Sequence, residues 1–199
     1  MLAKKNPTAH FSGLSIALTQ TPPCIIRLMN VRLLAIATIL FLVISGCGYN
    51  PARDKDCPGC DLNGANLSKV FLVETNLTEA NLTGANLTGA TLCGADLRGA
   101  KLRNANLAGA NLSPANLEET YLMGADLSYC DLSSANLRGS NLTDANLEGA
   151  NMADANCWGA TFSGANMNEV ILKGTDFRMG ADLSSAVGLS KSSLDDAIQ

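Results

Sequence analysis

The stretch Ala80-Asn81-Leu82-Thr83-Gly84-Ala85-Asn86-Leu87-Thr88-Gly89 contains one five-residue pattern twice, and the pattern continues on both sides of it. Leucine or another apolar residue occupies every fifth position from Leu62 to Phe177, which makes 24 consecutive repeats. Alanine lies two residues before that position in 16 of the 24 repeats, and the residue between them is usually Asn or Asp. Most of the chain is therefore one tandem repeat.

A period of five predicts a chain that turns regularly, because it matches neither the period of a helix (about 3.6) nor that of a strand (about 2). If each pentapeptide forms one side of a square coil, four of them close a turn, and successive turns stack at about 4.8 Å. The apolar position then fills the centre, and the alanine position leaves room for little more than a methyl group. A composition of 47% apolar but only 5% aromatic residues fits such a narrow core.

The repeats resemble the pentapeptide-repeat family, whose consensus A-(N/D)-L-x-x is matched by Ala85-Asn86-Leu87-Thr88-Gly89 and by Ala145-Asn146-Leu147-Glu148-Gly149. The resemblance covers about two thirds of the chain. It implies an all-β fold, a right-handed quadrilateral β-helix (a pentapeptide-repeat solenoid) of about six coils over residues 59–186.

The C-terminal end departs from the strict period. One extra residue follows Phe177, and the pattern restarts at Ala181-Asp182-Leu183. Residues 187–199 are predicted to form a short helical cap over the last apolar layer, with Ser190 as its N-cap and Leu194 and Ala197 on its inner face.

The front of the chain has the pattern of a secretory signal peptide. Arg32 precedes the uncharged apolar run 33–44, which is too short to span a bilayer comfortably, and small residues follow it. We therefore expect residues 1–46 to be a leader and signal peptide that is removed. Met1 and Met29 both fit as the true start.

Ile44-Ser45-Gly46-Cys47 resembles a bacterial lipobox, in which the cysteine is lipidated and becomes the new N-terminus. This resemblance predicts lipidation at Cys47 and a polar tether over residues 47–58. The alternative is an ordinary signal peptide, or a short membrane-touching helix, that ends in cysteine. Lipidation implies attachment to a bacterial membrane, facing the periplasm or an equivalent lumen.

The charge of the predicted mature chain argues against several functions. From Cys47 onward the chain carries 10 Lys and Arg residues against 18 acids, a net charge of −8. Direct binding to nucleic acid is not expected, because such binding depends on cationic side chains that neutralise phosphates. The only histidine, His10, lies in the predicted leader, so general acid–base catalysis by imidazole is not expected either.

Outward positions 20 residues apart are expected to lie above one another, which predicts a column that contains the only tryptophan. We interpret it as a candidate interaction surface, in which Arg98, Glu118 and Arg138 form an ion-pair ladder and Trp158 lies between two arginines. The alternative is a solvated ladder that only helps the coils to stack. Tyr121, Met123 and Tyr129 are also expected to face outward. The candidate residues of the column are Arg98, Glu118, Arg138, Trp158 and Arg178.

The cysteines allow several interpretations. The Cys57 and Cys60 spacing fits a disulfide in an oxidising compartment, half of a zinc site, or the ordinary start of the first coil. No second such pair and no nearby histidine completes a zinc site in the sequence, so neither a metal nor a cofactor is predicted. Cys130 and Cys157 fall at inward positions and are expected to be buried.

The sequence as a whole predicts a lipid-anchored protein of the cell envelope that is not an enzyme and that acts as a protein–protein interaction or scaffold module. Its protein partner and its oligomeric state are not indicated by any motif. An alternative comes from the family resemblance, because some pentapeptide-repeat proteins mimic duplex DNA and inhibit DNA gyrase. An acidic rod is compatible with that alternative, whereas a lipidated, exported protein and a column with several arginines are not.

Overall fold

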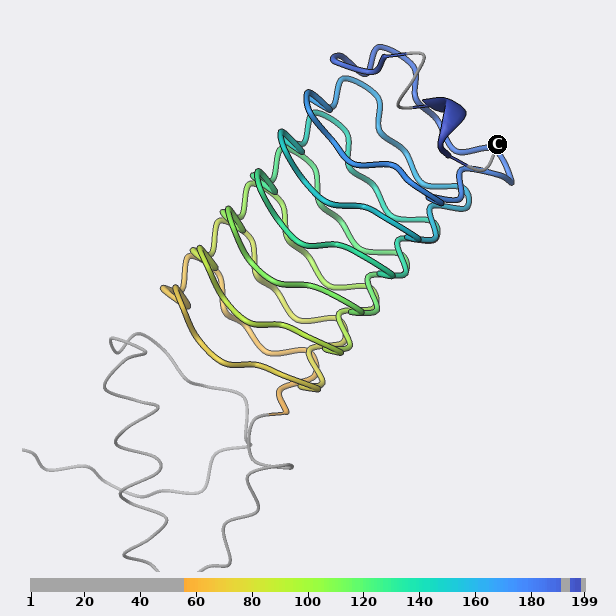
Figure 1. Cartoon of the computed structure of the whole chain (residues 1–199). Coiled ribbons are helices and arrows are strands. Elements are labelled where there is room, and N and C mark those ends of the chain that lie inside the picture. Colours follow the sequence, from red (N-terminus) through yellow and green to blue (C-terminus); the bar gives the residue numbers. More distant parts are fainter. Residues whose placement is uncertain (1–55, 191–193, 198–199) are drawn as a thin grey trace, which may run out of the picture.

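The computed structural model describes residues 56–190 and 194–197. These residues form a rod of stacked coils with one continuous core (Figure 1). The predicted leader, the signal peptide, Cys47 and most of the 47–58 tether lie outside the described residues. Within the described part, no helix is long and apolar enough to cross a membrane.

Parallel bridges join residues 20 apart, from Asp61 and Asn81 to Asn156 and Asp176. Four pentapeptides therefore close one turn, which confirms the four-sided cross-section. Each bridge is isolated, so the described part of the chain has no strand longer than one bridge residue. We call the side centred on Leu62 and every twentieth residue after it the first side. The second, third and fourth sides are centred in the same way on Leu67, Leu72 and Leu77.

Each corner is a β-turn that requires a left-handed residue. In the turn from Leu82 to Ala85, the N–H of Ala85 donates to the carbonyl of Leu82 at 3.0 Å, and Gly84 has a φ of 63°. A positive φ at the third residue is the mark of a type II turn, and it explains why glycine is frequent there. Several turns place another residue at this position, as with Glu79 at a φ of 58°.

Backbone hydrogen bonds between coils hold the rod together. In one pentapeptide, the N–H of Asn81 donates to the carbonyl of Cys60 in the preceding coil, at 2.8 Å. The N–H groups of Leu82 and Gly84 donate to Lys101 and Arg103 in the following coil, at 2.7 and 2.9 Å. Because every side repeats this arrangement, the polar backbone is satisfied without extended strands.

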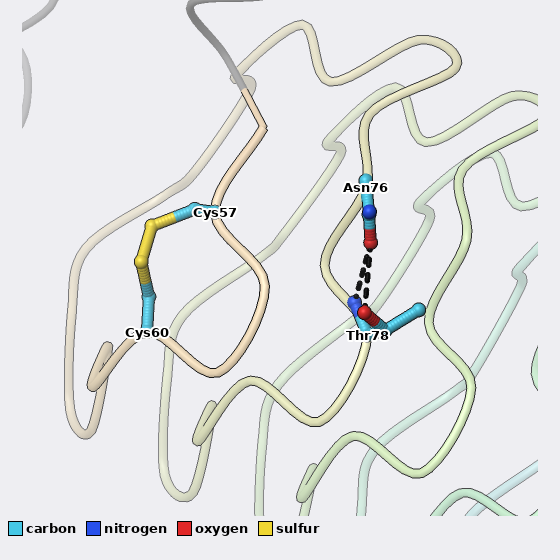
Figure 2. The surroundings of a disulfide bond; sticks show 4 residues. All are labelled: Cys57, Cys60, Asn76 and Thr78. Atoms are coloured by element: carbon cyan, nitrogen blue, oxygen red, sulfur yellow. Dashed lines mark hydrogen bonds between the residues drawn. A yellow bond between two sulfur atoms is a disulfide. The ribbon is translucent and has the colours of Figure 1, made fainter.

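The Asn or Asp before each inward residue has two structural roles. Its side-chain oxygen accepts from the backbone two residues later: Asn76 Oδ1 accepts from the N–H of Thr78 at 3.1 Å and from its hydroxyl at 2.9 Å (Figure 2). Its amide can also bond to the coil below, as Asn136 Nδ2 does to Asn116 Oδ1 at 3.0 Å. Asn and Asp readily form such turns, so the preference for them at this position is structural.

The core has the predicted arrangement of large and small layers. Leu87 and Ala85 are almost fully buried, as are their counterparts in the coils that follow. Near the C-terminal end the rings of Phe162 and Phe177 meet edge to face, with centroids 5.7 Å apart. Cys130 and Cys157 are buried and free, as predicted from their inward positions.

The register changes near the C-terminus as the sequence predicts. The bridges from Thr161 to Asp182 and from Asn166 to Val187 span 21 residues, because the chain has one extra residue after Phe177. Residues 194–195 are helical, while 191–193 and 198–199 lie outside the described residues. The helical cap over 187–199 and the count of about six coils stay predictions.

Candidate interaction surface

The five candidate residues lie on the fourth side of the rod, each directly after an inward core residue. We call this set, together with Thr78 at its N-terminal end, the Arg–Trp column. Bridges between Asn116 and Asn136, and between Asn136 and Asn156, place successive members one coil apart. The structure thus brings together the residues that the sequence had placed on one stripe: Arg98, Glu118, Arg138, Trp158 and Arg178.

The expected ion-pair ladder is only partly formed. Arg138 Nη1 lies 3.2 Å from Glu118 Oε1, in the preceding coil. Arg98 does not pair with Glu118; its Nη2 contacts Asp96 Oδ2 at 2.7 Å, within the same pentapeptide. The prediction of a three-member ladder was wrong at Arg98, because a carboxylate two residues away offers two hydrogen bonds without crossing to another coil.

Trp158 contacts one arginine. The guanidinium carbon of Arg178 lies 5.6 Å from the ring centroid, which is a cation–π distance. Arg178 also bonds to Asp176, with Nη2 to Oδ2 at 2.7 Å. The described residues show no cation–π contact between Trp158 and Arg138, so the predicted position between two arginines is not observed.

The indole N–H of Trp158 is shielded from solvent and has no hydrogen-bond partner within normal geometric limits. It nevertheless lies close enough to the Asp176 carboxylate to act on its charge. The Arg178 guanidinium holds the pKa of Asp176 well below its usual range, and the indole N–H adds to this effect. The pKa of Asp96 is also lowered, mainly through the hydrogen bond from Arg98.

Asp96 and Asp176 are the members of this site that the sequence reasoning missed. Each lies two residues before its arginine, in Asp96-Leu97-Arg98 and Asp176-Phe177-Arg178. Arg138 has Asn136 at the equivalent position and turns to Glu118 instead. An Asp at the outward position before the core residue is thus the sequence feature that would have predicted which arginines pair within their own coil.

An open depression of about 500 Å³ lies at the N-terminal end of the Arg–Trp column. A β-helix with a filled interior was expected to offer no cleft, and this hollow lies on its outer surface. It contains no histidine or cysteine, and no group of three His, Cys, Asp or Glu residues within the described ranges could hold a metal ion. It is lined by Thr78, Glu79, Arg98, Gly99, Glu118 and Glu119.

The structure joins Cys57 and Cys60 by a disulfide at the start of the first coil (Figure 2). Cys57 lies 20 residues before Leu77, and its N–H donates to the carbonyl of Asn76 at 2.8 Å, in the manner of an inward residue. Of the three interpretations of this pair, the structure therefore shows the disulfide. The disulfide joins the leucine and alanine positions of the repeat, so it also serves as the ordinary start of the coil.

The sequence matches the family described as Pentapeptide repeats (8 copies) over residues 60–99, 100–139 and 140–178. The chain belongs to this family, whose fold is the right-handed β-helix. Pentapeptide-repeat proteins are generally structural or inhibitory proteins, and nothing found in this chain points to catalysis. No curated protein matches the sequence at a significant level.

Several solved structures are similar to this chain. QnrB1, a plasmid-mediated fluoroquinolone resistance protein, is 18% identical over 69% of this chain and 76% of its own, with a TM-score of 0.40. The pentapeptide repeat protein alr5209 from Nostoc Pcc 7120 is 30% identical over 63% of this chain and 79% of its own, with a TM-score of 0.38. Rfr23 from the cyanobacterium Cyanothece 51142 is 30% identical over 74% of this chain and 98% of its own, with a TM-score of 0.25.

Proposed function

We propose that this protein is a lipid-anchored interaction or scaffold module of the bacterial cell envelope. The observation that carries the proposal is the division of the repeat into a uniform interior and a varied exterior. Inward positions are almost all Leu and Ala and are buried, whereas charged and aromatic side chains stand on outward positions. A surface of this kind, fixed by hydrogen bonds between coils, binds a partner with little loss of conformational entropy.

Within this proposal the Arg–Trp column is the site of recognition. Trp and Arg are the residues most enriched at binding hot spots, and the column combines the only tryptophan with three arginines. Arg138 is exposed and bonded only through one nitrogen to Glu118, so most of its donors are available to a partner.

The proposed anchor is a lipidated Cys47, and the proposed location is the periplasmic or an equivalent lumenal face of a membrane. Support comes from the lipobox-like sequence and from the Cys57–Cys60 disulfide, since stable disulfides are typical of oxidising compartments. Only a short segment separates Cys47 from the first described residue, Asp56, so the rod would be held close to the lipid surface.

The test of the anchor is mass spectrometry of the N-terminal peptide from cells, with detergent partitioning of the wild type and of Cys47→Ala. We expect a diacylated or triacylated Cys47 in the wild type, and an unprocessed chain in the variant. Cys93→Ala serves as the matched control and should be processed normally. An unmodified Met1 or Met29 on a soluble cytoplasmic protein would contradict the anchor.

That contradictory result would favour the alternative function, an acidic rod that inhibits a DNA-binding enzyme such as DNA gyrase. The alternative draws support from the excess of acids over Lys and Arg. It requires, however, that the protein meets such an enzyme in the cytoplasm. Inhibition of purified gyrase by the rod, abolished by heat unfolding, would support it directly.

A further inference from the structure

We propose that Lys101, Arg103, Tyr121 and Met123 form a second docking surface, which binds an acidic segment of a partner protein. This first-side patch lies on a different side of the rod from the Arg–Trp column. It adds a second binding surface to the proposed function and does not depend on the first.

The backbone fixes the four side chains as two adjacent pairs. Lys101 and Tyr121 are bridge partners, and the N–H groups of Leu102 and Asn104 donate to the carbonyls of Tyr121 and Met123, at 2.8 and 3.0 Å. Lys101 and Arg103 flank the buried Leu102, so both project outward. Their backbones stand roughly 6–7 Å apart along the chain, and those of the neighbouring coil lie about 4.8 Å away.

The two cations of the patch have no ion-pair partner among the described residues. The three arginines of the Arg–Trp column, by contrast, are each paired. On that adjoining side, Asp96 and Glu118 are already bonded to arginines. Lys101 and Arg103 are both exposed, so they form a free positive patch on a chain whose predicted mature form has an excess of acids.

The other half of the patch supplies apolar contact area. The side chain of Tyr121 is 52% exposed, and Met123 beside it is half-buried. Tyr, Met and Arg are all enriched in the cores of protein–protein interfaces. An occupant that satisfies both halves carries carboxylates for Lys101 and Arg103 and an aliphatic or aromatic side chain for Tyr121.

The spacing of the cations favours an extended peptide. Alternate residues of an extended chain point the same way at about the same 6–7 Å interval, so an Asp/Glu-x-Asp/Glu segment running along the side matches both charges. A membrane surface is disfavoured, because lipid-binding clusters usually contain about four to eight Lys and Arg residues, and the acidic rod would be repelled by anionic headgroups.

The test is a fluorescence-anisotropy titration of the purified full-length protein with a labelled peptide of alternating Glu and Leu residues. The double variant Lys101→Gln/Arg103→Gln should bind about tenfold more weakly than the wild type, and added salt should weaken wild-type binding. The matched control, Lys69→Gln/Lys173→Gln, removes the same charge from other sides and should bind as the wild type does. Tyr121→Ser should also weaken binding, whereas Tyr129→Ser should not.

Equal losses in the two double variants would overturn the proposal, because binding would then depend only on net charge. Unchanged binding in Lys101→Gln/Arg103→Gln would overturn it too. A parallel sedimentation assay uses vesicles of phosphatidylglycerol and phosphatidylcholine. If the double variant lost vesicle binding but kept peptide binding, the occupant would be a lipid headgroup and the peptide proposal would be wrong. Self-association of the wild type that the double variant lacks would replace the partner with a second copy of this chain.

Discussion

The ring of Tyr129 lies against Gly149, the residue at the equivalent corner one coil further along the rod. A Cβ atom on Gly149 would come within 2.6 Å of the ring carbons Cδ1 and Cε1 of Tyr129. The phenol reaches Glu148, to whose Oε1 its hydroxyl donates at 3.3 Å. The charge of Glu148 raises the pKa of the Tyr129 phenol, because it disfavours the phenolate. A glycine is therefore needed above this tyrosine for a packing reason as well as for its backbone conformation.

The first prediction compares alanine at two corner glycines. Gly149 and Gly109 have φ values of 63° and 64°, so Gly149→Ala and Gly109→Ala carry the same backbone cost, about 1–2 kcal/mol. Only Gly149→Ala also displaces the Tyr129 ring, since nothing lies within 4 Å of a Cβ on Gly109. We expect its free energy of unfolding, from urea titration, to fall by about 1 kcal/mol more than that of Gly109→Ala. Equal losses would show that the ring moves aside freely.

A second prediction concerns the inward and outward positions of the repeat. Leu107 is fully buried, and Leu107→Asp would place a carboxylate without a partner in the core. We expect a loss of several kcal/mol, enough to unfold neighbouring coils. Ala108→Asp is the matched control on the adjacent outward position and should change the melting temperature little. Circular-dichroism melts of both variants decide the matter, and similar damage from both would contradict the inward and outward assignment.

The third prediction tests the Arg–Trp column as a recognition surface. Trp158→Ala removes the ring that Arg178 covers and should reduce capture of a partner from crosslinked, solubilised membranes. Because Trp158 is half-buried, we expect a fall of a few degrees in melting temperature, but not unfolding. Tyr129→Ala, which removes an exposed aromatic from another side, is the control and should leave capture unchanged. Capture that survives Trp158→Ala would reduce the column to a solvated ladder, and a large loss of stability would give Trp158 a packing role.

Much of this arrangement follows from the sequence, because the five-residue period alone separates Leu107 from Ala108 and aligns the members of the Arg–Trp column. The choice of ion-pair partners does not follow from the period. Arg98 has carboxylates in its own pentapeptide and in the next coil, and only the side-chain geometry decides between them. The Cys57–Cys60 pair was open for a similar reason, since the same spacing suits a disulfide or half of a zinc site.

A fourth prediction concerns the free cysteines of the described residues. Burial raises the pKa of the Cys130 thiol to about 12 and raises that of Cys157 further, so both stay protonated and shielded near neutral pH. Cys93 is half-buried at an outward position. With iodoacetamide at about pH 8, peptide mass spectrometry should find Cys93 modified in the folded protein and the other two only in guanidinium. Rapid labelling of Cys130 in the native rod would mean that the coils open locally.

The 20-residue register makes the rod's surface a lattice, in which a shift along the sequence is equivalent to a step in a fixed direction. Deleting or duplicating 20 residues would shorten or lengthen every column by one member and leave all sides facing as before. Gaining or losing a single pentapeptide would instead rotate everything beyond it by a quarter turn. Pairs inside one pentapeptide, such as Asp176 and Arg178, would survive either event. A pair between coils, such as Glu118 and Arg138, would be separated by any single pentapeptide inserted between them. Natural variants of this chain that differ by whole coils can therefore keep the same binding surfaces, whereas those that differ by one repeat must rebuild them.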